Sequence, residues 1–338
     1  MSKDDGARRS ELLFCYDVRM ANPNGDPDEN RPRIDPVTKK NLVTDFRLKR
    51  TIRDYLQQQY PEKYKIFIRA EADAAGNLKQ IEDLAENYIQ KTDEKIKVGK
   101  KEVKKMIVDR RSLIKDHIDI RLFGILFAVN IEKQNISFKQ VGPVQFAIGQ
   151  SLNPVEEVPI RITRVVPTRA ELKAGTFGEK SILRYSFIAF RGFVNDVVGK
   201  ETGLTENEVE TMLKAMWFGT NALSTTSKYG QQSRLLLRLC YKEPHTYIGD
   251  LDRCISLNQD EMKIEPSKLE DIRQLVLNVD DLFNLLTKNV GEIDEIQYAS
   301  SDNLMCSWKG EIGTFSKHLS KWYEKEGKPK KIVLSKIV

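Results

Sequence analysis

Residues 17–56 read DVRMANPNGDPDENRPRIDPVTKKNLVTDFRLKRTIRDYL, and the order of the first structural elements follows from this stretch. It begins inside an alternating run at residues 12–20, which predicts a β-strand with Leu13 and Asp17 on the same face. Residues 22–36 are rich in Asn, Gly, Asp and Pro and predict a long loop without regular structure. A strand therefore leads through an irregular loop into the next element.

The segment after this loop predicts an amphipathic helix. Thr44 and Asp45 offer N-cap chemistry, and Pro61 ends the helix after about residue 59. The apolar stripe of the helix consists of Leu48, Ile52, Tyr55 and Leu56. The opposite side carries Arg47, Lys49, Arg50 and Arg53. We expect these cations to point away from the core, where they could hold phosphates or form an ordinary solvated face.

Four later segments continue the alternation of strands and helices. They are a strand at 141–150, a strand at 183–194, a helix at 205–218 and a strand at 233–240. The second helix opens with a capping box between Thr205 and Glu208. The resulting order is strand, helix, strand, strand, helix, strand. It predicts an α+β, ferredoxin-like fold of the kind that RNA-recognition proteins share.

Two insertions interrupt this order, and a further helix is predicted near the C-terminus. Residues 91–115 are densely basic, and their apolar residues Val103, Met106, Ile107 and Ile114 could form a helical face. Residues 151–180 contain Pro and Arg and predict an exposed hairpin or arm. The amphipathic helix near the C-terminus is predicted from Ile272, Leu275, Val276, Val279, Phe283 and Leu286.

The composition limits the class of protein. Of 338 residues, 40% are hydrophobic and 31% are charged, which supplies a real core and excludes wholesale disorder. The net charge of +6 is weak evidence for nucleic acid by itself. The four cysteines and three histidines lack metal-site spacing, and no GxxxxGK[ST], GxSxG or HExxH pattern occurs. Without a signal-peptide core or a membrane-spanning run, we expect a cytoplasmic protein with reduced thiols.

The loop before the first helix could carry chemistry of its own. Its carboxylates are Asp26, Asp28, Glu29 and Asp35. Clustered carboxylates can bind a hard cation or act in hydrolysis, but Asn and Asp in turns also hydrogen-bond their own backbone. No His or Lys partner stands at a recognisable spacing, so turn chemistry is favoured and no metal or cofactor is expected. Asn24 and Gly25 could let the backbone approach a ligand closely.

Two further segments are candidates for binding. The arm at 151–180 carries the cations Arg161, Arg164, Arg169, Lys173 and Lys180 together with Phe177. Such an arm could wedge between bases while holding phosphates, or it could be a mobile surface loop. The polar loop at 224–232 contains Ser224, Thr225 and Lys228. It could hydrogen-bond a nucleic-acid backbone or merely connect a helix to a strand.

The sequence resembles a known family at several of these blocks. Residues 17–56 closely resemble the N-terminal signature of the backbone family of CRISPR-associated Cascade complexes, in its type I-B and I-C branches. Looser similarity follows in IDIRLFG (118–124), VGPVQFAIGQSLNPV (141–155), ITR (162–164) and the region from GTFGEK to RGF (175–193). The matches run from about residue 12 to residue 239.

The resemblance implies the architecture of a right hand. It implies an RRM-like palm formed by 10–60, 119–150 and 181–245, a basic helical finger insertion at 61–118, a thumb at 151–180, and a C-terminal region at 246–338 that completes the palm or makes subunit contacts. Copies of such proteins polymerise along a guide crRNA and present it for base pairing with target DNA in antiviral defence. The implied partners are further copies of the chain and the guide-processing, large and small Cascade subunits, with no membrane.

The resemblance also assigns roles to individual residues. The guide-backbone contact at the start of the first helix corresponds to Thr44, Asp45, Lys49, Arg50 and Arg53, with Arg47 beside them and Asn24 and Arg33 in the adjoining loop. The thumb contact corresponds to Arg161, Arg164, Arg169, Phe177 and Lys180. Weaker contacts are expected from Ser224, Thr225 and Lys228 in the second loop.

The resemblance further implies that the protein is not an enzyme. Related type III backbone subunits cut target RNA with a loop aspartate, for which Asp26 is the nearest candidate by position, but this sequence carries the type I motif. The alternatives are a metal-dependent RNA endonuclease using Asp26 and Asp28, or a generic single-stranded RNA-binding module.

Overall fold

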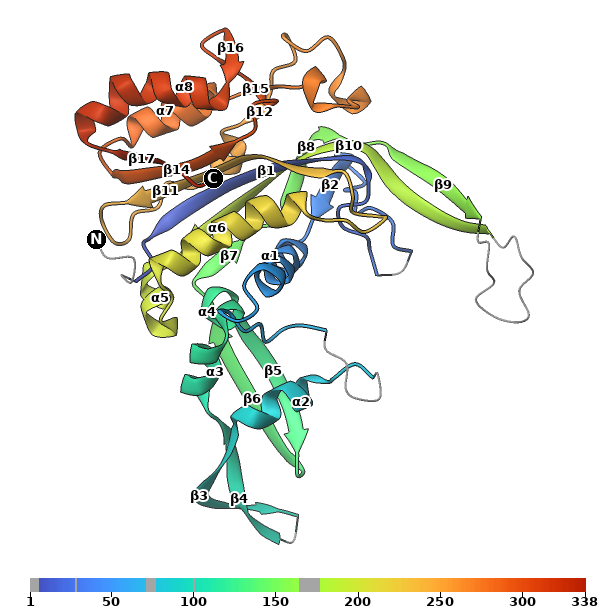
Figure 1. The fold of residues 1–338 in the computed structure, drawn as a ribbon, viewed down its shortest axis with the longest axis vertical. Coiled ribbons are helices and arrows are strands. Elements are labelled where there is room, and N and C mark those ends of the chain that lie inside the picture. Colours follow the sequence, from blue (N-terminus) through green and yellow to red (C-terminus); the bar gives the residue numbers. More distant parts are fainter. Residues whose placement is uncertain (1–5, 28, 71–76, 100, 164–176) are drawn as a thin grey trace. The chain divides into compact units, whose positions relative to one another are not determined.

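The computed structural model describes residues 6–27, 29–70, 77–99, 101–163 and 177–338 (Figure 1). The fold is mixed α and β. The predicted site residues Asp28, Arg164 and Arg169, together with Lys173 and the side chain of Phe177, lie outside the described part of the chain. In the described residues, no helix is long and apolar enough to cross a membrane.

The helices and strands have the following bounds. The helices are α1 Asp45–Gln59, α2 Ile81–Ala85, α3 Arg110–Asp116, α4 Ile118–Phe123, α5 Asp196–Thr202, α6 Glu206–Asn221, α7 Asp280–Lys288 and α8 Phe315–Trp322. The strands up to the middle of the chain are β1 Ser10–Ala21, β2 Lys40–Val43, β3 Ile89–Val98, β4 Lys101–Val108, β5 Gly124–Ile131, β6 Gln134–Val141, β7 Val144–Phe146, β8 Gly149–Pro154 and β9 Glu157–Thr163. The remaining strands are β10 Phe177–Val194, β11 Gln231–Tyr241, β12 Ser256–Leu257, β13 Val276–Asn278, β14 Ile293–Ser300, β15 Met305–Trp308, β16 Glu311–Thr314 and β17 Val333–Lys336.

The chain divides into two compact units, each assembled from segments that are far apart in the sequence. Unit 1 comprises Met1–Arg8, Ile52–Gln145 and Val194–Ala215. Unit 2 comprises Arg9–Thr51, Phe146–Phe193 and Met216–Val338.

The large sheet of unit 2 is organised around β1. Its strand order is β17-β14-β11-β1-β10-β8-β2, and β9 pairs with β10 to form a hairpin (Figure 1). Residues 11–18 of β1 are all buried, because strands flank both edges and side chains cover both faces. Alternate residues therefore serve different layers: Cys15 faces one apolar cluster, whereas the Tyr16 ring on the other face stacks on Phe190 at 6.1 Å.

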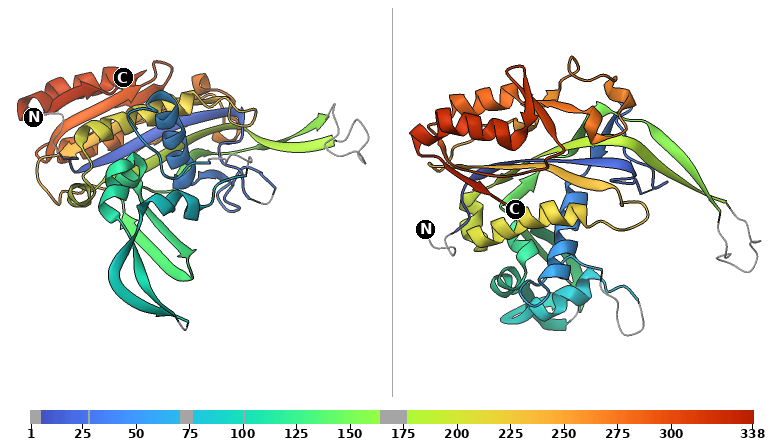
Figure 2. Two further views of the ribbon diagram at one scale, coloured as in Figure 1. Left: turned by 60° about the horizontal axis from the view of Figure 1, so that its bottom comes forward. Right: turned by 45° about the horizontal axis from the view of Figure 1, so that its top comes forward.

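The C-terminal third covers one face of this sheet. Helices α7 and α8 lie together over the same face, as the orange and red ribbons of Figure 2 show. Phe283 of α7 and Trp322 of α8 are at most 1% exposed and share one apolar cluster with Leu235 and Leu237 of β11. A region whose role the sequence leaves open thus supplies most of the buried residues of this apolar cluster.

Unit 1 is built on two antiparallel hairpins, β3–β4 and β5–β6. Phe127 and Phe138 pair directly across the second hairpin, and both are buried in the core of the unit with Phe67. Side chains along β6 alternate between buried and exposed, as expected of a strand with one covered face.

Several local predictions are confirmed. The first helix runs from Asp45 to Gln59, and the backbone N–H of Arg47 donates to Thr44 Oγ1 at 3.4 Å. The capping box of α6 is present in both directions, since Glu208 N donates to Thr205 Oγ1 at 3.3 Å and Thr205 N donates to Glu208 Oε2 at 3.1 Å. These interactions connect residues close in sequence, which is why the sequence could predict them.

The predicted helical face in residues 91–115 is wrong. Val103, Met106 and Ile107 lie on β4, and only Ile114 is helical, in α3. A spacing of three and four residues fits a helix, but the β-branched residues on both sides of Gly99 pair instead as a hairpin. Gly99 has φ +64°, a conformation that glycine adopts without strain at a turn.

The predicted helix across residues 272–286 is also only partly correct. The short strand β13 occupies its centre and pairs in parallel with β15, and α7 begins only at Asp280. Leu277 on β13 is fully buried. Pairing with a strand about thirty residues away decided the conformation here, and a local sequence window does not contain that partner.

A buried ion pair lies next to the end of β1 in unit 2. The carboxylate of Asp17 accepts hydrogen bonds from Arg234 Nε at 2.8 Å and Nη2 at 3.0 Å. The Tyr185 hydroxyl donates to the same carboxylate at 3.0 Å. Burial raises the pKa of Asp17, while the hydrogen bonds from Arg234 and Tyr185 oppose that rise.

Asp17→Ala should lower the free energy of unfolding by about 3–5 kcal/mol, because it leaves the Arg234 cation buried without a counter-charge. The double variant Asp17→Leu/Arg234→Met removes both charges, and its free energy of unfolding should fall by much less. Urea unfolding of both proteins is the measurement. Equal losses in the single and double variants would show that the pair does not act through buried charge.

Candidate nucleic-acid interface

The loop at 22–36 is fixed to the start of α1 by Asn24. Its side-chain Oδ1 accepts hydrogen bonds from both the backbone N–H and the hydroxyl of Thr44, each at 2.9 Å. The Asn24 amide nitrogen donates to the Gly25 carbonyl at 3.0 Å, and the Arg33 N–H donates to the Asn24 carbonyl at 3.2 Å. Both polar atoms of the Asn24 side chain are therefore engaged in holding loop and helix together.

The loop carboxylates make turn contacts. Asp26 Oδ1 accepts the Glu29 N–H at 2.8 Å. Asp35 Oδ1 accepts the N–H groups of Val37 at 2.8 Å and Thr38 at 3.0 Å, and these bonds hold the pKa of the Asp35 carboxyl below its usual value. Among the described residues, no group of three His, Cys, Asp or Glu side chains is placed to hold a metal ion.

Three cations from distant parts of the sequence meet in unit 2. Lys228 Nζ donates to the Asn22 carbonyl at 2.7 Å, and Lys180 Nζ donates to the Thr226 carbonyl at 2.5 Å. Burial, followed by the positive charges of Arg47 and Lys180, lowers the pKa of Lys228 to about 8. The helix start, the hairpin and the 224–232 loop, each a predicted binding segment, thus contribute one cation each to one basic cluster: Arg47, Lys180 and Lys228.

Polar and aromatic groups in the same segments remain available for binding. Within the described residues, the buried Nε of Arg33 and the buried Nε2 of Gln231 have no hydrogen-bond partner. Phe46 is 75% exposed at the start of α1, and Tyr229 is 76% exposed next to Lys228. Exposed rings beside cations are the groups that hold single-stranded bases and phosphates.

A cleft of about 520 Å³ in unit 2 is lined in part by the 224–232 loop. Its lining includes Arg19, Met20, Tyr229 and Gln232, with the buried Asp17–Arg234 pair among the other lining residues. Sequence reasoning missed Phe46, Tyr229 and Arg19. Phe46 could have been found, since a large aromatic residue directly before the apolar stripe of α1 has no place in that stripe.

The predicted orientation of two helix cations is wrong. Lys49 is only 7% exposed and pairs with Asp45 at 3.0 Å. Arg53 pairs with the fully buried Asp119 at 2.9 Å inside unit 1, and its guanidinium lies 5.2 Å from the centre of the Phe123 ring. Each of these two cations directly follows a residue of the apolar stripe in the sequence. The buried face of α1 is wider than that stripe, and it includes both cations. Arg50, by contrast, is exposed.

The remaining predicted residues lie on the hairpin and the second loop. Arg161 is exposed on β9, with Nε 4.0 Å from the carboxylate of Glu179, its partner on β10. The hairpin base is held by Arg31, whose Nε and Nη2 donate to Glu157 at 2.8 and 2.7 Å. Ser224 and Thr225 are exposed.

The fold and this surface define the class of protein. It is a mixed α/β protein whose basic cluster and exposed aromatic residues are suited to binding a polyanion. A family model, CRISPR-associated protein Cas7, matches residues 8–278. The chain belongs to the CRISPR-associated protein Cas7 family.

Individual relatives are similar over most of their length. A CRISPR-associated protein Cas7 from Haloferax volcanii is 29% identical over 314 residues, which cover 88% of each chain. A chain of a solved CRISPR RNA-guided surveillance complex is similar with a TM-score of 0.48 and 12% identity, over 87% of this chain and 90% of that chain. A chain of such a complex in a pre-nicking state gives a TM-score of 0.49 and 14% identity, over 87% and 93%.

Arg53→Ala should reduce the free energy of unfolding by about 3–5 kcal/mol, because Asp119 is fully buried and would lose its cation. The N–H groups of Phe67 and Ile68, which donate to Asp119 at 2.9 and 3.1 Å, cannot neutralise the charge. Arg50→Ala on the same helix is the matched control and should change stability by less than about 1 kcal/mol. Chemical denaturation measures both; equal stability of the two variants would contradict the buried role of Arg53.

Proposed function

We propose that this chain is the backbone subunit of a Cascade-type surveillance complex and binds guide crRNA through the sugar–phosphate backbone. The observation that carries the proposal is the cluster of Arg47, Lys180 and Lys228, in which three separate segments place positive charge together. Membership of the CRISPR-associated protein Cas7 family supports the same role. Phosphate contacts hold a strand without reading its sequence, so recognition is left to base pairing between guide and target.

We further propose that the centre of unit 2 is an RRM-like palm. The strands β1, β8, β10 and β11, taken in chain order as first to fourth, stand in the spatial order β11-β1-β10-β8. Helix α1 follows the first of them and α6 follows the third, which is the ferredoxin-like connectivity. In this interpretation the β9–β10 hairpin is the thumb and the segment with the β3–β4 hairpin is the finger insertion.

The polymerising partner in this proposal is a second copy of the chain. A hairpin that leaves the sheet at β9 and β10 can reach a neighbouring subunit on the same guide, and a repeated head-to-tail contact generates an open filament. Other Cascade subunits would bind at the ends and along the filament. Target DNA joins through the guide.

We propose no catalytic role for the loop carboxylates. Asp26 Oδ1 accepts the Glu29 N–H, which is a turn contact, and no observation in the described residues favours the nuclease alternative. The proposed protein therefore holds RNA and leaves it intact.

The triple variant Arg47→Ala/Lys180→Ala/Lys228→Ala should bind single-stranded RNA at least tenfold more weakly than the wild type at about 0.1 M salt, and similarly for different sequences. The plot of log affinity against log salt should also become less steep, by roughly 2 for three lost phosphate contacts. Fluorescence anisotropy over a salt series measures both quantities.

The matched control is Lys317→Ala/Lys325→Ala/Lys328→Ala, which removes the same charge from the C-terminal region of unit 2. These lysines lie near Glu311, Glu326 and Glu324, respectively. The control should retain wild-type affinity within about threefold, because its lysines lie outside the cluster. If both triple variants weaken equally, binding depends on net charge alone and the cluster is not the interface.

Binding through the cluster should also depend on pH. The free Lys228 ammonium has a pKa of about 8, and a bound phosphate would restore its usual value, so affinity should fall about tenfold from pH 7 to pH 9 as free Lys228 loses its proton. Lys228→Arg should abolish this fall, because a guanidinium stays charged throughout. Oligoadenylate is the probe, since its base does not ionise in this range. An equal pH dependence in wild type and Lys228→Arg would exclude Lys228 as the cause.

A further inference from the structure

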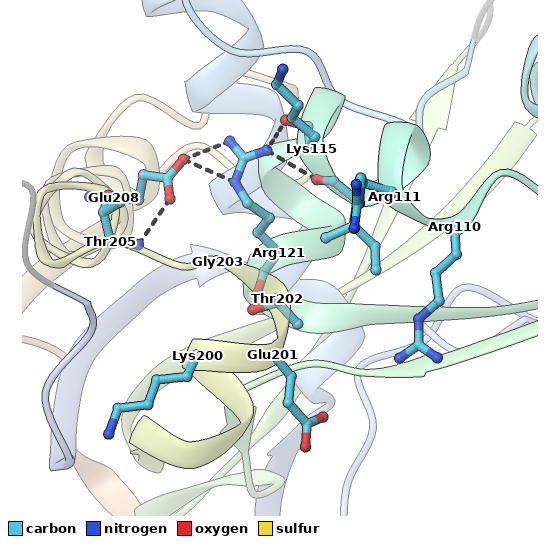
Figure 3. Close-up of a pocket in the computed structure, with 11 residues that line it drawn as sticks. Arg110, Arg111, Lys115, Arg121, Lys200, Glu201, Thr202, Gly203, Thr205 and Glu208 are labelled. Carbon is cyan, nitrogen blue, oxygen red and sulfur yellow. Dashed lines mark hydrogen bonds and ion pairs between the residues drawn. The ribbon is translucent and has the colours of Figure 1, made fainter.

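A second basic concavity lies within unit 1 and shares no lining residue with the basic cluster of unit 2. It is a pocket of about 630 Å³ lined by α3, α4, α5 and the start of α6 (Figure 3). Its cationic lining residues are Arg110, Arg111, Lys115, Arg121 and Lys200. Its carboxylates are Glu201 and Glu208.

One ion pair forms a fixed wall of this pocket. Arg121 Nε and Nη2 donate to Glu208 Oε1 at 3.1 and 2.5 Å. Arg121 Nη1 donates to the carbonyls of Ile114 and Lys115, and Figure 3 marks the bond to Lys115 with a dashed line. The side chains of Arg121 and Glu208 are only 13% and 9% exposed, and because their charges neutralise each other, this pair adds little net charge to the pocket.

The other cations of the pocket remain available. Arg111, Lys115 and Lys200 are exposed, and within the described residues none of them has a carboxylate within ion-pair distance. Arg110 donates to the neutral Gln140 side chain at 2.6 Å and has no carboxylate partner among the residues that the structure describes. Glu201 is the single remaining carboxylate of the lining, so the pocket holds an excess of positive charge.

Lysines elsewhere in the same unit behave differently. On the β3–β4 hairpin, Lys91 pairs with Glu132 at 2.8 Å, Lys95 with Glu102 at 3.7 Å, Lys104 with Asp93 at 3.2 Å and Lys105 with Glu94 at 2.9 Å. Within the described residues, four of the six lysines of this hairpin therefore have a carboxylate partner, and three of those partners belong to the hairpin itself. The pocket differs in that three exposed cations line one concavity without a carboxylate partner.

We infer that this pocket binds phosphodiester groups of a polynucleotide strand. Guanidinium and ammonium groups that line one concavity without carboxylate partners suit phosphate oxygens. The cations are exposed around an open concavity of nucleotide size, which fits a strand passing through better than an enclosed small anion. The inference rests on the proposed function in one respect, which is that the bound anion is a nucleic acid. The strand is either the guide itself or the strand that is paired with the guide.

The test compares two triple variants that lose the same charge from unit 1. The pocket variant is Arg111→Ala/Lys115→Ala/Lys200→Ala, and the control is Lys91→Ala/Lys95→Ala/Lys105→Ala on the hairpin. Five of the six residues are exposed and Lys105 is partly buried, and none of them belongs to the basic cluster of unit 2. Each protein is titrated with a guide-length RNA alone and with that RNA annealed to complementary DNA, over a salt series. Thermal unfolding verifies that the variants are folded, and Lys115→Gln/Lys200→Gln replaces the pocket variant if it is not.

The pocket variant should bind at least one of the two probes about tenfold more weakly than the wild type, with a shallower salt dependence, while the control stays within about threefold. If the pocket variant binds the unpaired RNA more weakly, the pocket contacts the guide backbone. If it binds only the annealed probe more weakly, the pocket contacts the complementary strand. Wild-type binding of both probes by the pocket variant, or an equal loss in the control, would overturn the inference. If wild-type protein binds neither probe, it is the proposed function that fails.

Discussion

The burial of β1 on both faces and along both edges is the constraint on which the rest of unit 2 depends. A strand in that position cannot leave a polar group unsatisfied, because no water reaches it. Its two carboxylates are accordingly paired: Asp17 with Arg234, and Glu11 with the Tyr241 hydroxyl at 2.5 Å and two backbone N–H groups. These bonds run to β11 and to the chain after it, so the pairing partner of β1 is specified by polar contacts as well as by apolar packing.

The same strand also determines where binding groups appear. β1 ends at Ala21, and the loop that follows is held to α1 by Asn24 while Lys228 reaches back to the Asn22 carbonyl. A rigid scaffold with irregular loops at its strand ends is a common way to present binding residues. Burial, followed by the charges of Arg47 and Lys180, lowers the pKa of Lys228, and both effects favour an anion beside it.

Charged side chains serve two different purposes in this protein. Near β1, ion pairs are buried and structural, as in Asp17–Arg234 in unit 2; in unit 1, Arg53–Asp119 and Arg121–Glu208 play the same part. Other cations lie on exposed surface without carboxylate partners in the described residues, as around the pocket of α3 and α5. A cation that appears on the polar side of a helical pattern can belong to either group. Only its partner decides which.

The sequence by itself determined the elements whose bonds are local. It predicted α1 and its Thr44 cap, the Thr205–Glu208 capping box and the strand β1, because these depend on residues a few positions apart. Tertiary structure alone decided that residues 276–278 form a strand, that Arg53 is an inner ion-pair partner, and that Arg47, Lys180 and Lys228 meet. Each of these outcomes depends on a partner far away in the chain. Local propensity and periodicity carry no information on such a partner, since burial and long-range pairing create the interaction only after folding.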